Sequence, residues 1–269
     1  MDPKRLGLIA GNGKFPILFA QKAKSQDIKV ITAGVKGDTS WKVRFFSDKF
    51  KLFKAGDLKK IFLYFKENGI TDVLMAGQVN PKHLFDTRLS MDEDFKRVFQ
   101  TLKDRKADTI FLAIAEKLKE QGFKLIDSTF LLKDCLALKG TLTKRGPTLN
   151  ELEDIEFGRD IAKAMGAIDV GQTVVIKDKA IVAIEAMEGT DKAILRGGKI
   201  AQKNAVVVKM SKPNQDFRFD VPVVGPKTIR NMVKAHASCL AVETGKTIMI
   251  DQEVVVKLAN KNNVSILGI

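Results

Sequence analysis

The sequence predicts an α/β protein with an N-terminal Rossmann-like parallel-sheet domain and a second, mixed α/β domain. In the first half, strand-like and helix-like segments alternate, which is typical of βαβ units and a parallel sheet. Around residues 133–150 this periodicity stops in a polar stretch that contains glycines and a proline. With 269 residues the chain is long enough for two ordinary domains. The predicted division is therefore 1–133, a linker at 134–150, and 151–269.

The first half contains the pattern of a doubly wound sheet. Helix periodicity follows or precedes each short apolar run, and Pro16 suits the first turn of its helix. Three of the strand-like runs end in Ala-Gly. Ligands of open parallel sheets bind at the carboxyl ends of the strands, so these glycines mark the expected ligand edge. The predicted strands are 6–11, 28–34, 71–77 and 123–127, and the predicted helices are 15–26, 58–69, 92–106 and 108–122.

The second half differs, because it opens with a long helix and a hairpin. Residues 172–187 consist of two β-rich runs that a Lys-Asp-Lys turn joins, which predicts antiparallel pairing. The acidic first turn of the segment at 150–166 complements a helix dipole. Further strands are predicted at 204–210, 239–250 and 263–268, and further helices at 226–237 and 251–262.

Composition limits the classes of function. The formal net charge of +14 favours anionic partners such as nucleotides, nucleic acid or anionic lipid. Cys135 and Cys239 are too few for a disulfide framework, which indicates a reducing cytosol. With only His83 and His236, a histidine-rich zinc site or a Ser-His-Asp triad is not expected, and we interpret the two as one packed and one surface residue.

A glycine loop follows the first strand, at Gly11-Asn12-Gly13, just before a helix. Such a loop lets a phosphate approach backbone N–H groups at a helix N-terminus. The third glycine of the dinucleotide fingerprint is absent, and no acid ends the second strand, so NAD binding is not indicated. A plain tight turn and a nucleotide contact remain alternatives.

Acids also gather where a strand ends, at Glu185, Glu188 and Asp191. Gly189 permits a sharp turn there, and Thr190 or Asp191 is suited to cap the following helix. The same oxygens suit a hard cation. Between the two, the residues by themselves favour capping.

The stretch "SKPNQDFRFDVPVVG" at residues 211–225 concentrates acids and bases in one irregular connection. Asp216 and Asp220 supply carboxylates and Gln215 a neutral ligand. Lys212 and Arg218, with Lys209 just before the stretch, suit phosphate. Mg²⁺ needs only one or two carboxylates when phosphates complete its shell, so the stretch favours a metal–phosphate site. The alternative is a loop whose charges pair with one another.

A basic and aromatic segment occupies residues 41–66, with eight basic residues, two acids and eight aromatics. A nucleic-acid face or a membrane-surface face has this composition. The spacing favours another interpretation, in which the aromatics belong to the core and the lysines to a solvated face.

Five motifs occur together and in order: "LIAGNGKFP", "MAGQVNP", "DVGQTVVI", "AIEAMEGTD" and "KPNQDFRFDVPVVG". On them the chain resembles, over nearly its whole length, the UDP-2,3-diacylglucosamine pyrophosphatase family of lipid A biosynthesis, the type unrelated to calcineurin-like phosphoesterases. The resemblance implies Mg²⁺-dependent hydrolysis of UDP-2,3-diacylglucosamine to UMP and 2,3-diacylglucosamine 1-phosphate. It also implies that two domains enclose the substrate.

The resemblance also implies roles for individual residues. Asp220, the last acid of the most specific motif, is the implied essential carboxylate, and Asp191 and Asp216 join it as implied Mg²⁺ ligands. Asp191 is also implied as catalytic, so the second domain would carry the catalytic acids and the lipid-side contacts. Family members carry Lys-Gly-Asp-Asp where this chain has "KADT" at residues 106–109. The implied substrate contacts are Gly11, Asn12, Gly13, Gly77, Gln78, Lys106, Asp108, Gln172, Thr190, Lys212, Gln215 and Arg218.

Charge and substrate together predict where the protein works. A basic enzyme with a diacylated substrate is expected in the cytoplasm, peripheral to the anionic cytoplasmic face of the inner membrane. No recognised nucleic-acid motif occurs, so no nucleic-acid partner is expected, while a homodimer is allowed. The alternative to an enzyme is a non-catalytic sugar-nucleotide or lipid-binding protein.

Overall fold

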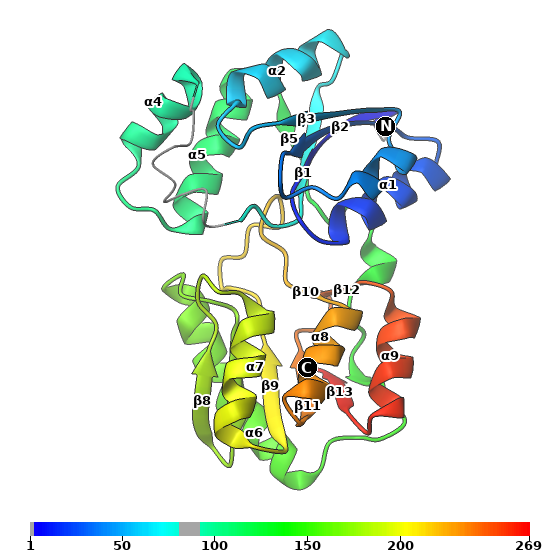
Figure 1. Ribbon diagram of the computed structural model, residues 1–269, viewed down its shortest axis with the longest axis vertical. Helices are drawn as coiled ribbons and strands as arrows, with labels where there is room; N and C mark the ends of the chain where they lie inside the picture. The colour runs from blue at the N-terminus through cyan, green and yellow to red at the C-terminus, as the bar shows by residue number, and fades with distance from the viewer. Residues whose placement is uncertain (1–2, 81–91) are drawn as a thin grey trace. The chain divides into compact units, whose positions relative to one another are not determined.

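The computed structural model describes residues 3–80 and 92–269, which form two compact units (Figure 1). Unit 1 comprises Met1–Leu132 together with Asp216–Asp220, and unit 2 comprises Lys133–Gln215 and Val221–Ile269. A five-residue segment from the second half of the sequence therefore belongs to unit 1. His83 lies outside the described residues. Within those residues, no helix has the length and apolarity needed to cross a bilayer.

Unit 1 is built on a parallel sheet of order β3-β2-β1-β4-β5. The central strands β1 and β4 are almost wholly buried, which explains their continuous apolar runs. The Rossmann-like prediction is confirmed, and β3 is a strand that the sequence pattern did not predict. The strands are β1 (Arg5–Ala10), β2 (Lys29–Val35), β3 (Lys49–Phe53), β4 (Asp72–Ala76) and β5 (Lys124–Leu125).

Helices cover both faces of the unit 1 sheet (Figure 1). Apolar side chains of α2, α4 and α5 form one core with strand residues such as Ile9 and Met75. The Asp92 carboxylate accepts the N–H of Phe95 at 2.9 Å and so caps α4. The helices are α1 (Phe15–Ser25), the 3₁₀ helix η1 (Trp41–Phe46), α2 (Leu58–Glu67), α4 (Glu93–Thr101) and α5 (Ala107–Glu120).

Unit 2 contains a six-stranded mixed sheet of order β6-β13-β11-β9-β7-β8. Strands β9, β11 and β13 are parallel, whereas β7 and β8 form the predicted antiparallel hairpin, whose turn residues Asp178 and Lys179 have positive φ. The mixed α/β prediction is thereby confirmed. The strands are β6 (Gly140–Thr141), β7 (Thr173–Lys177), β8 (Ala180–Ile184), β9 (Ala205–Lys209), β11 (Ala237–Val242) and β13 (Ser265–Gly268), and β10 (Val223–Val224) pairs with β12 (Ile248–Met249).

The helices of unit 2 also divide between two cores. One core joins α6 to residues such as Val174 and Val208, and the other joins α7, α8 and α9 to residues such as Val207 and Leu240. Gly158 of α6 is required by this packing, since a Cβ there would lie 2.5 Å from Ile176. The helices are α6 (Leu149–Ala167), α7 (Thr190–Ala201), α8 (Pro226–Lys234) and α9 (Gln252–Lys261).

The segment 134–150, predicted as a linker, takes part in unit 2. It includes the end of the 3₁₀ helix η2 (Lys133–Cys135) and the strand β6, which pairs antiparallel with β13. The polar and turn residues around β6 give no strand pattern. Its hydrogen-bond partner, β13, lies more than 120 residues later in the chain, so the pairing could not be predicted locally. The compact units also change over within 211–225, where the sequence predicted no boundary.

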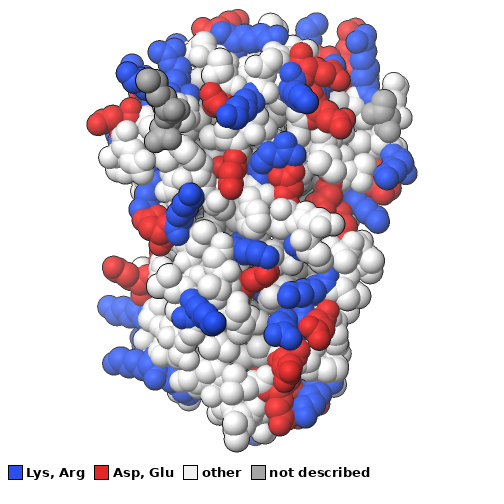
Figure 2. All heavy atoms as spheres, turned by 180° about the vertical axis from the view of Figure 1, so that it is seen from behind, with Lys and Arg blue, Asp and Glu red and all other residues white. Residues whose placement is uncertain are grey.

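The basic and aromatic segment 41–66 has two kinds of surroundings. Phe53, Phe62 and Phe65 are buried in the unit 1 core, as the favoured interpretation predicted. Trp41 and Phe45 in η1 are instead 53% and 67% exposed, which that interpretation did not predict. The face seen in Figure 2 shows basic side chains interspersed with acidic ones, so the net charge of +14 does not form a single basic patch there.

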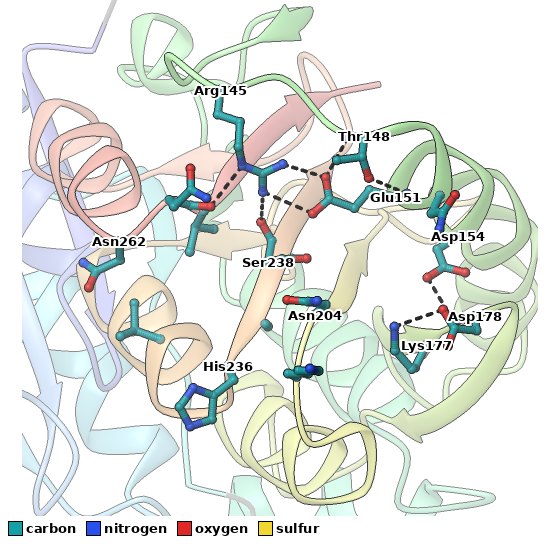
Figure 3. A pocket seen from close by; sticks show the side chains of 16 residues that line it. Arg145, Thr148, Glu151, Asp154, Lys177, Asp178, Asn204, His236, Ser238 and Asn262 are labelled. Carbon is teal, nitrogen blue, oxygen red and sulfur yellow. Dashed lines mark hydrogen bonds and ion pairs between the residues drawn. The ribbon is translucent and has the colours of Figure 1, made fainter.

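An ion pair joins the start of α6 to the amino-terminal ends of β11 and β13 in unit 2 (Figure 3). The Arg145 guanidinium donates to both oxygens of Glu151, at 2.8 and 3.1 Å, and to the carbonyl oxygens of Ser238 and Asn263. Glu151 also accepts the N–H of Thr148, which completes a capping box.

Stability of unit 2 should fall in acid, because Glu151 must then take up a proton. Burial opposes ionisation of Glu151, but hydrogen bonds from Arg145 and its neighbours outweigh burial and lower the pKa. A depressed folded-state pKa stabilises the fold above the unfolded value of about 4.3, and this contribution is lost as pH falls through the folded value. Urea unfolding between pH 2.5 and 7 should show a smaller acid loss for Glu151→Gln than for the unaltered chain. Equal slopes would contradict the assignment.

The two thiols should differ in reactivity. Burial raises the pKa of Cys239 to about 12, and its side chain is fully buried, whereas Cys135 is half-buried. Since the thiolate is the reactive species, Ellman's reagent at pH 8 should titrate Cys135 in the native protein and both thiols only in urea. Comparable native rates at both positions, separated by a Cys135→Ser variant, would show the prediction to be wrong.

Candidate functional site

Two loops meet at the carboxyl edge of the unit 1 sheet. Gly11 follows β1, and its N–H donates to the carbonyl of Ala76 at 2.8 Å. Asn12 and Gln78 exchange backbone hydrogen bonds, at 2.7 and 3.3 Å. The glycine loop before α1 and the Gly77-Gln78 loop after β4 are thus one structure. It gathers five predicted substrate contacts: Gly11, Asn12, Gly13, Gly77 and Gln78.

Glycine is needed where these loops approach each other. Gly77 has φ +84°, and a Cβ there would collide with the carbonyl of Asn12. At Gly11 a Cβ would lie 2.7 Å from the Gln78 carbonyl oxygen. The backbone is therefore brought close at the N-terminal end of α1, which is the geometry that oxyanions bind.

Gly77→Ala should separate the two loops. Both the positive φ and the collision with Asn12 oppose the side chain, so we expect a loss of about 1–3 kcal/mol in the free energy of unfolding. On the nucleotide role that the motif resemblance implies for this edge, UMP binding measured by calorimetry should also weaken. Gly122→Ala is the matched control, because Gly122 has a similar φ of +88° but nothing within 4 Å of its Cβ position. Equal UMP affinity of the two variants would mean that nucleotide binding does not depend on the contact between the two loops.

The segment Asp216–Asp220 is anchored at the same edge. Ser128 is fully buried, and its hydroxyl lies 2.6 Å from the Met75 carbonyl oxygen and 2.8 Å from that of Arg218. Its N–H donates to the carbonyl of Phe217 at 2.8 Å. Phe219 stacks on Phe111 with ring centroids 5.4 Å apart. Asp220 is therefore carried on a segment that hydrogen bonds and apolar packing fix beside the end of β4.

Asp216 and Arg218 bind each other within this segment. The guanidinium donates to both carboxylate oxygens at 2.6–3.1 Å. These hydrogen bonds hold the pKa of Asp216 below its ordinary value. For these two residues, the structure therefore matches the alternative prediction, in which charges of the loop pair with one another. Asp216 could bind a metal, and Arg218 a substrate, only if this ion pair opened.

Asp220 is half-buried at the end of the segment, and its N–H donates to the carbonyl of Asp216 at 3.2 Å. At the start of α5, Lys106 is the N-cap residue and Asp108 lies in the first turn. Asp104 accepts the N–H of Lys106 at 3.1 Å. The predicted residues Asp220, Lys106 and Asp108 all belong to unit 1.

A second polar cluster lies in unit 2, where β7, β9 and α7 meet. Lys209 is 5% exposed, and its ammonium donates to the hydroxyls of Thr190 and Thr173 at 2.8 and 3.2 Å. Thr190 lies 2.8 Å from a Glu185 oxygen, and Glu185 lies 3.6 Å from the Lys209 nitrogen. The predicted capping by Thr190 or Asp191 is wrong, because Gly189 at φ +84° is the N-cap and no side chain caps the helix.

The other predicted residues of unit 2 are Asp191, Lys212, Gln215 and Gln172. Asp191 pairs with the exposed Lys227 at 2.8 Å. Lys212 is 7% exposed and donates to Asp169 at 2.6 Å, so a direct phosphate contact would require that buried pair to open. The backbone N–H of Lys212 binds the side-chain oxygen of Gln215 at 3.0 Å. Gln172 is buried, immediately before β7.

The structure therefore groups the predicted residues in two sets, one in each unit. Asp220 and Asp216 belong to unit 1, and Asp191 belongs to unit 2. In residues 3–80 and 92–269, no group of three or more Asp, Glu, His or Cys side chains converges as a metal cage would. A single carboxylate still suits Mg²⁺, which keeps several waters and binds substrate phosphates.

Sequence reasoning missed Ser128, Glu185 as the partner of Thr190, and Asp169. Ser128 comes directly after "LID", at the end of a predicted strand, which is a usable signal. Its partner Arg218 lies 90 residues away, and Lys209 and Lys212 bind Thr190 and Asp169, which lie 19 and 43 residues earlier in the chain. These pairings have no local pattern from which to predict them.

A pocket of about 560 Å³ in unit 2 lies elsewhere (Figure 3). Asn204 and Ser238, which line it, mark the amino ends of β9 and β11, opposite the edge at which parallel sheets bind ligands. Arg145 and Glu151, which also line it, bind each other. The contacts of this pocket explain stability and give no reason to place the reaction there.

Comparisons with known proteins cover the chain. The model "LpxI N-terminal domain" matches residues 5–135, and "LpxI C-terminal domain" matches residues 138–267. A protein of Caulobacter vibrioides is named UDP-2,3-diacylglucosamine pyrophosphatase LpxI. It is 26% identical to this chain over an alignment of 284 positions, which covers 99% of this chain and 98% of that protein.

Solved structures give weaker matches. The biotin carboxylase domain of 2-oxoglutarate carboxylase from Hydrogenobacter thermophilus has a TM-score of 0.30 at 11% identity, over 74% of this chain and 42% of that one. N5-carboxyaminoimidazole synthetase from Staphylococcus aureus has a TM-score of 0.24 at 16% identity, over 64% and 37%. The chain thus spans less than half of either.

Proposed function

We propose the function from one premise: the chain belongs to the LpxI family, whose two domain models together match nearly all of it. On this basis the protein is an enzyme that hydrolyses the diphosphate of UDP-2,3-diacylglucosamine, with release of UMP and 2,3-diacylglucosamine 1-phosphate, in lipid A biosynthesis. The observation that carries the proposal is the match to a pyrophosphatase along 99% of the chain.

The carboxyl edge of unit 1 supports a nucleotide-diphosphate role. Gly11, Asn12 and Gly77 bring backbone close to the first turn of α1, where N–H groups and the helix dipole favour a phosphate. Ser128 and Phe219 fix the segment that carries Asp220 at this edge. We assign Asp220 as the catalytic carboxylate that orients the attacking water.

Magnesium is part of the proposal. The donor set fits it, because Asp220 supplies one carboxylate, and substrate phosphate oxygens and water can fill the remaining positions. Bound there, Mg²⁺ would neutralise charge on the diphosphate oxygens. Asp191 remains a proposed Mg²⁺ ligand and catalytic residue. Asp216 would bind Mg²⁺ only after its ion pair with Arg218 has opened. Thr190 and Gln172 are assigned to substrate contact from unit 2.

In the experiment, UMP release from UDP-2,3-diacylglucosamine in detergent is measured with Mg²⁺, with EDTA, and with EDTA followed by excess Mg²⁺. We expect turnover that EDTA abolishes and Mg²⁺ restores. Binding without turnover would favour a sugar-nucleotide or lipid-binding protein instead. Turnover that persists after EDTA would remove Mg²⁺ from the proposal but leave the hydrolase.

We also propose that the enzyme works in the cytoplasm at the anionic inner leaflet. The support is a net charge of +14 together with a substrate that carries two acyl chains. A homodimer is compatible with this arrangement, and sedimentation velocity would measure it.

A further inference from the structure

We propose that an exposed surface of unit 1, the aromatic–basic patch, docks the protein on an anionic lipid bilayer. The patch extends the membrane association proposed above by naming the surface that makes it. It therefore rests on the proposed function only through the lipid-linked substrate. We define the patch as Trp41, Lys42, Arg44, Phe45, Phe50 and Leu52.

The aromatic side chains of the patch are held outward by a fixed backbone. Val43, in the middle of η1, is fully buried. The Ser47 hydroxyl binds the carbonyl of Val43 at 3.0 Å and the hydroxyl of Thr32 at 2.7 Å. Because η1 is anchored in this way, Trp41 and Phe45 keep 53% and 67% of their surfaces exposed instead of turning into the core.

The apolar members of the patch are continuous with one another. The rings of Trp41 and Phe50 meet edge to face, with centroids 5.3 Å apart. Leu52, 36% exposed, lies two residues after Phe50 and therefore on the same face of β3. Large apolar side chains gathered at the surface in this way mark an interaction site more often than isolated ones do.

Basic side chains of η1 and α1 lie beside these rings. Residues 41–54 contain five basic residues and one acid, Asp48. Lys49 and Lys51 do not contribute to the patch, because they alternate with Phe50 and Leu52 and lie on the other face of β3, where Lys49 binds Asn68 and Lys51 lies over the Tyr64 ring. The Asp48 carboxylate accepts the N–H of Val30 at 2.8 Å, so a hydrogen bond to β2 holds it in place. The Arg44 guanidinium stacks over the Trp41 ring at 5.2 Å, and Lys24 of α1 adds a base 3.4 Å from the carbonyl of Phe45. Positive charge beside amphipathic rings complements an anionic lipid surface.

The patch also adjoins the edge where the polar loops gather. Thr39, two residues before Trp41, hydrogen-bonds through its hydroxyl to the carbonyl of Ala10, directly before the glycine loop. An enzyme whose substrate resides in a bilayer gains from docking beside its nucleotide-side loops. That advantage favours a lipid surface over nucleic acid or a second copy of the chain.

The test uses Trp41 itself, which is the single tryptophan of the chain. Vesicles of phosphatidylcholine with 30% phosphatidylglycerol should shift its emission to shorter wavelength, and pure phosphatidylcholine vesicles should not. Raising NaCl from 50 to 500 mM should reverse most of the shift, since screening weakens the charge contribution. Flotation of the same samples measures binding independently of the fluorophore.

Two double variants test whether vesicle binding depends on the patch in particular or on any exposed apolar side chains. Phe45→Ser/Leu52→Ser should lower vesicle affinity by about tenfold or more, because two apolar side chains no longer enter the interface. Leu149→Ser/Ile200→Ser in unit 2 is the matched control, since those residues are 78% and 61% exposed, and its affinity should be unchanged. Circular dichroism verifies that each variant folds.

Five outcomes would overturn the inference. Four are no flotation of the unaltered protein, flotation with unchanged Trp41 emission, equal affinities in the two double variants, and an emission shift with oligonucleotide in place of vesicles. The fifth is self-association without lipid that Phe45→Ser abolishes, which would assign the patch to a second copy of the chain. The detergent assay for UMP release uses no bilayer, so its result decides the hydrolase proposal separately.

Discussion

Replacing Asp220 by Asn should lower kcat for UMP release by about 100-fold or more, with little change in the thermal unfolding midpoint. The reason is geometric. Ser128, Phe111 and Phe219 hold the segment in place, so the substitution removes a carboxylate without removing its support. Loss of one preorganised charged group at a reacting centre has an effect of this size. Steady-state kinetics with UDP-2,3-diacylglucosamine in detergent measures it.

Asp216→Asn is the matched control for this experiment. It changes an aspartate four residues away, whose carboxylate is bound to Arg218 in the same segment. We expect a modest loss of stability and a much smaller fall in kcat than at Asp220. A fall that is equally large at both positions would mean that Asp216 also takes part in the reaction, as the Mg²⁺ ligand proposed for it or through the shared segment. Full activity of Asp220→Asn would remove Asp220 from the mechanism.

Replacing Arg145 by Ala should lower the free energy of unfolding of unit 2 by about 3–5 kcal/mol. The substitution leaves the Glu151 carboxylate, which is 7% exposed, without its bidentate partner, and a buried uncompensated charge has a cost of this size. It also leaves the carbonyls of Ser238 and Asn263 without their donor. Urea unfolding at pH 7, followed by circular dichroism, gives the difference.

The double variant Arg145→Met/Glu151→Met identifies the cause. Because it removes both charges, it should recover a substantial part of the stability that Arg145→Ala loses, although the two carbonyls still lack a donor. Lys179→Ala is the control, since Lys179 makes an exposed pair with Glu153 at 2.7 Å and should cost less than about 1 kcal/mol. A cost below 1 kcal/mol at Arg145 as well would contradict a structural role for the pair.

Much of the fold could be predicted from local pattern. The alternation in the first half and the hairpin at 172–187 were both confirmed. β3 escaped prediction although Lys49, Phe50, Lys51 and Leu52 alternate in polarity, because this short edge strand lies inside the segment 41–66, which was interpreted as a whole from the spacing of its aromatics. β6 escaped because two residues that pair with the distant β13 leave no periodicity of their own.

The candidate site could be predicted only in part. Motif resemblance pointed to Asp220, and the strand-end glycines pointed to the loops that meet at Asn12 and Gln78. The sequence could not show which charged side chains are available to a ligand. Their availability depends on ion-pair and hydrogen-bond partners that are distant in the chain. Lys212 is bound by Asp169, 43 residues earlier, and Thr190 binds Glu185 instead of capping its helix.

Periodicity and motifs a few residues long were enough to predict the α/β class and the family, and they proposed the residues that a diphosphate hydrolase would use. That Asp216–Asp220 belongs to unit 1, and which charges neutralise one another, became known from the folded chain alone. Ion pairs and hydrogen bonds depend on distance in space, which local sequence does not encode. Residues such as Ser128 and Arg218, 90 positions apart, become neighbours only when the sheet has formed.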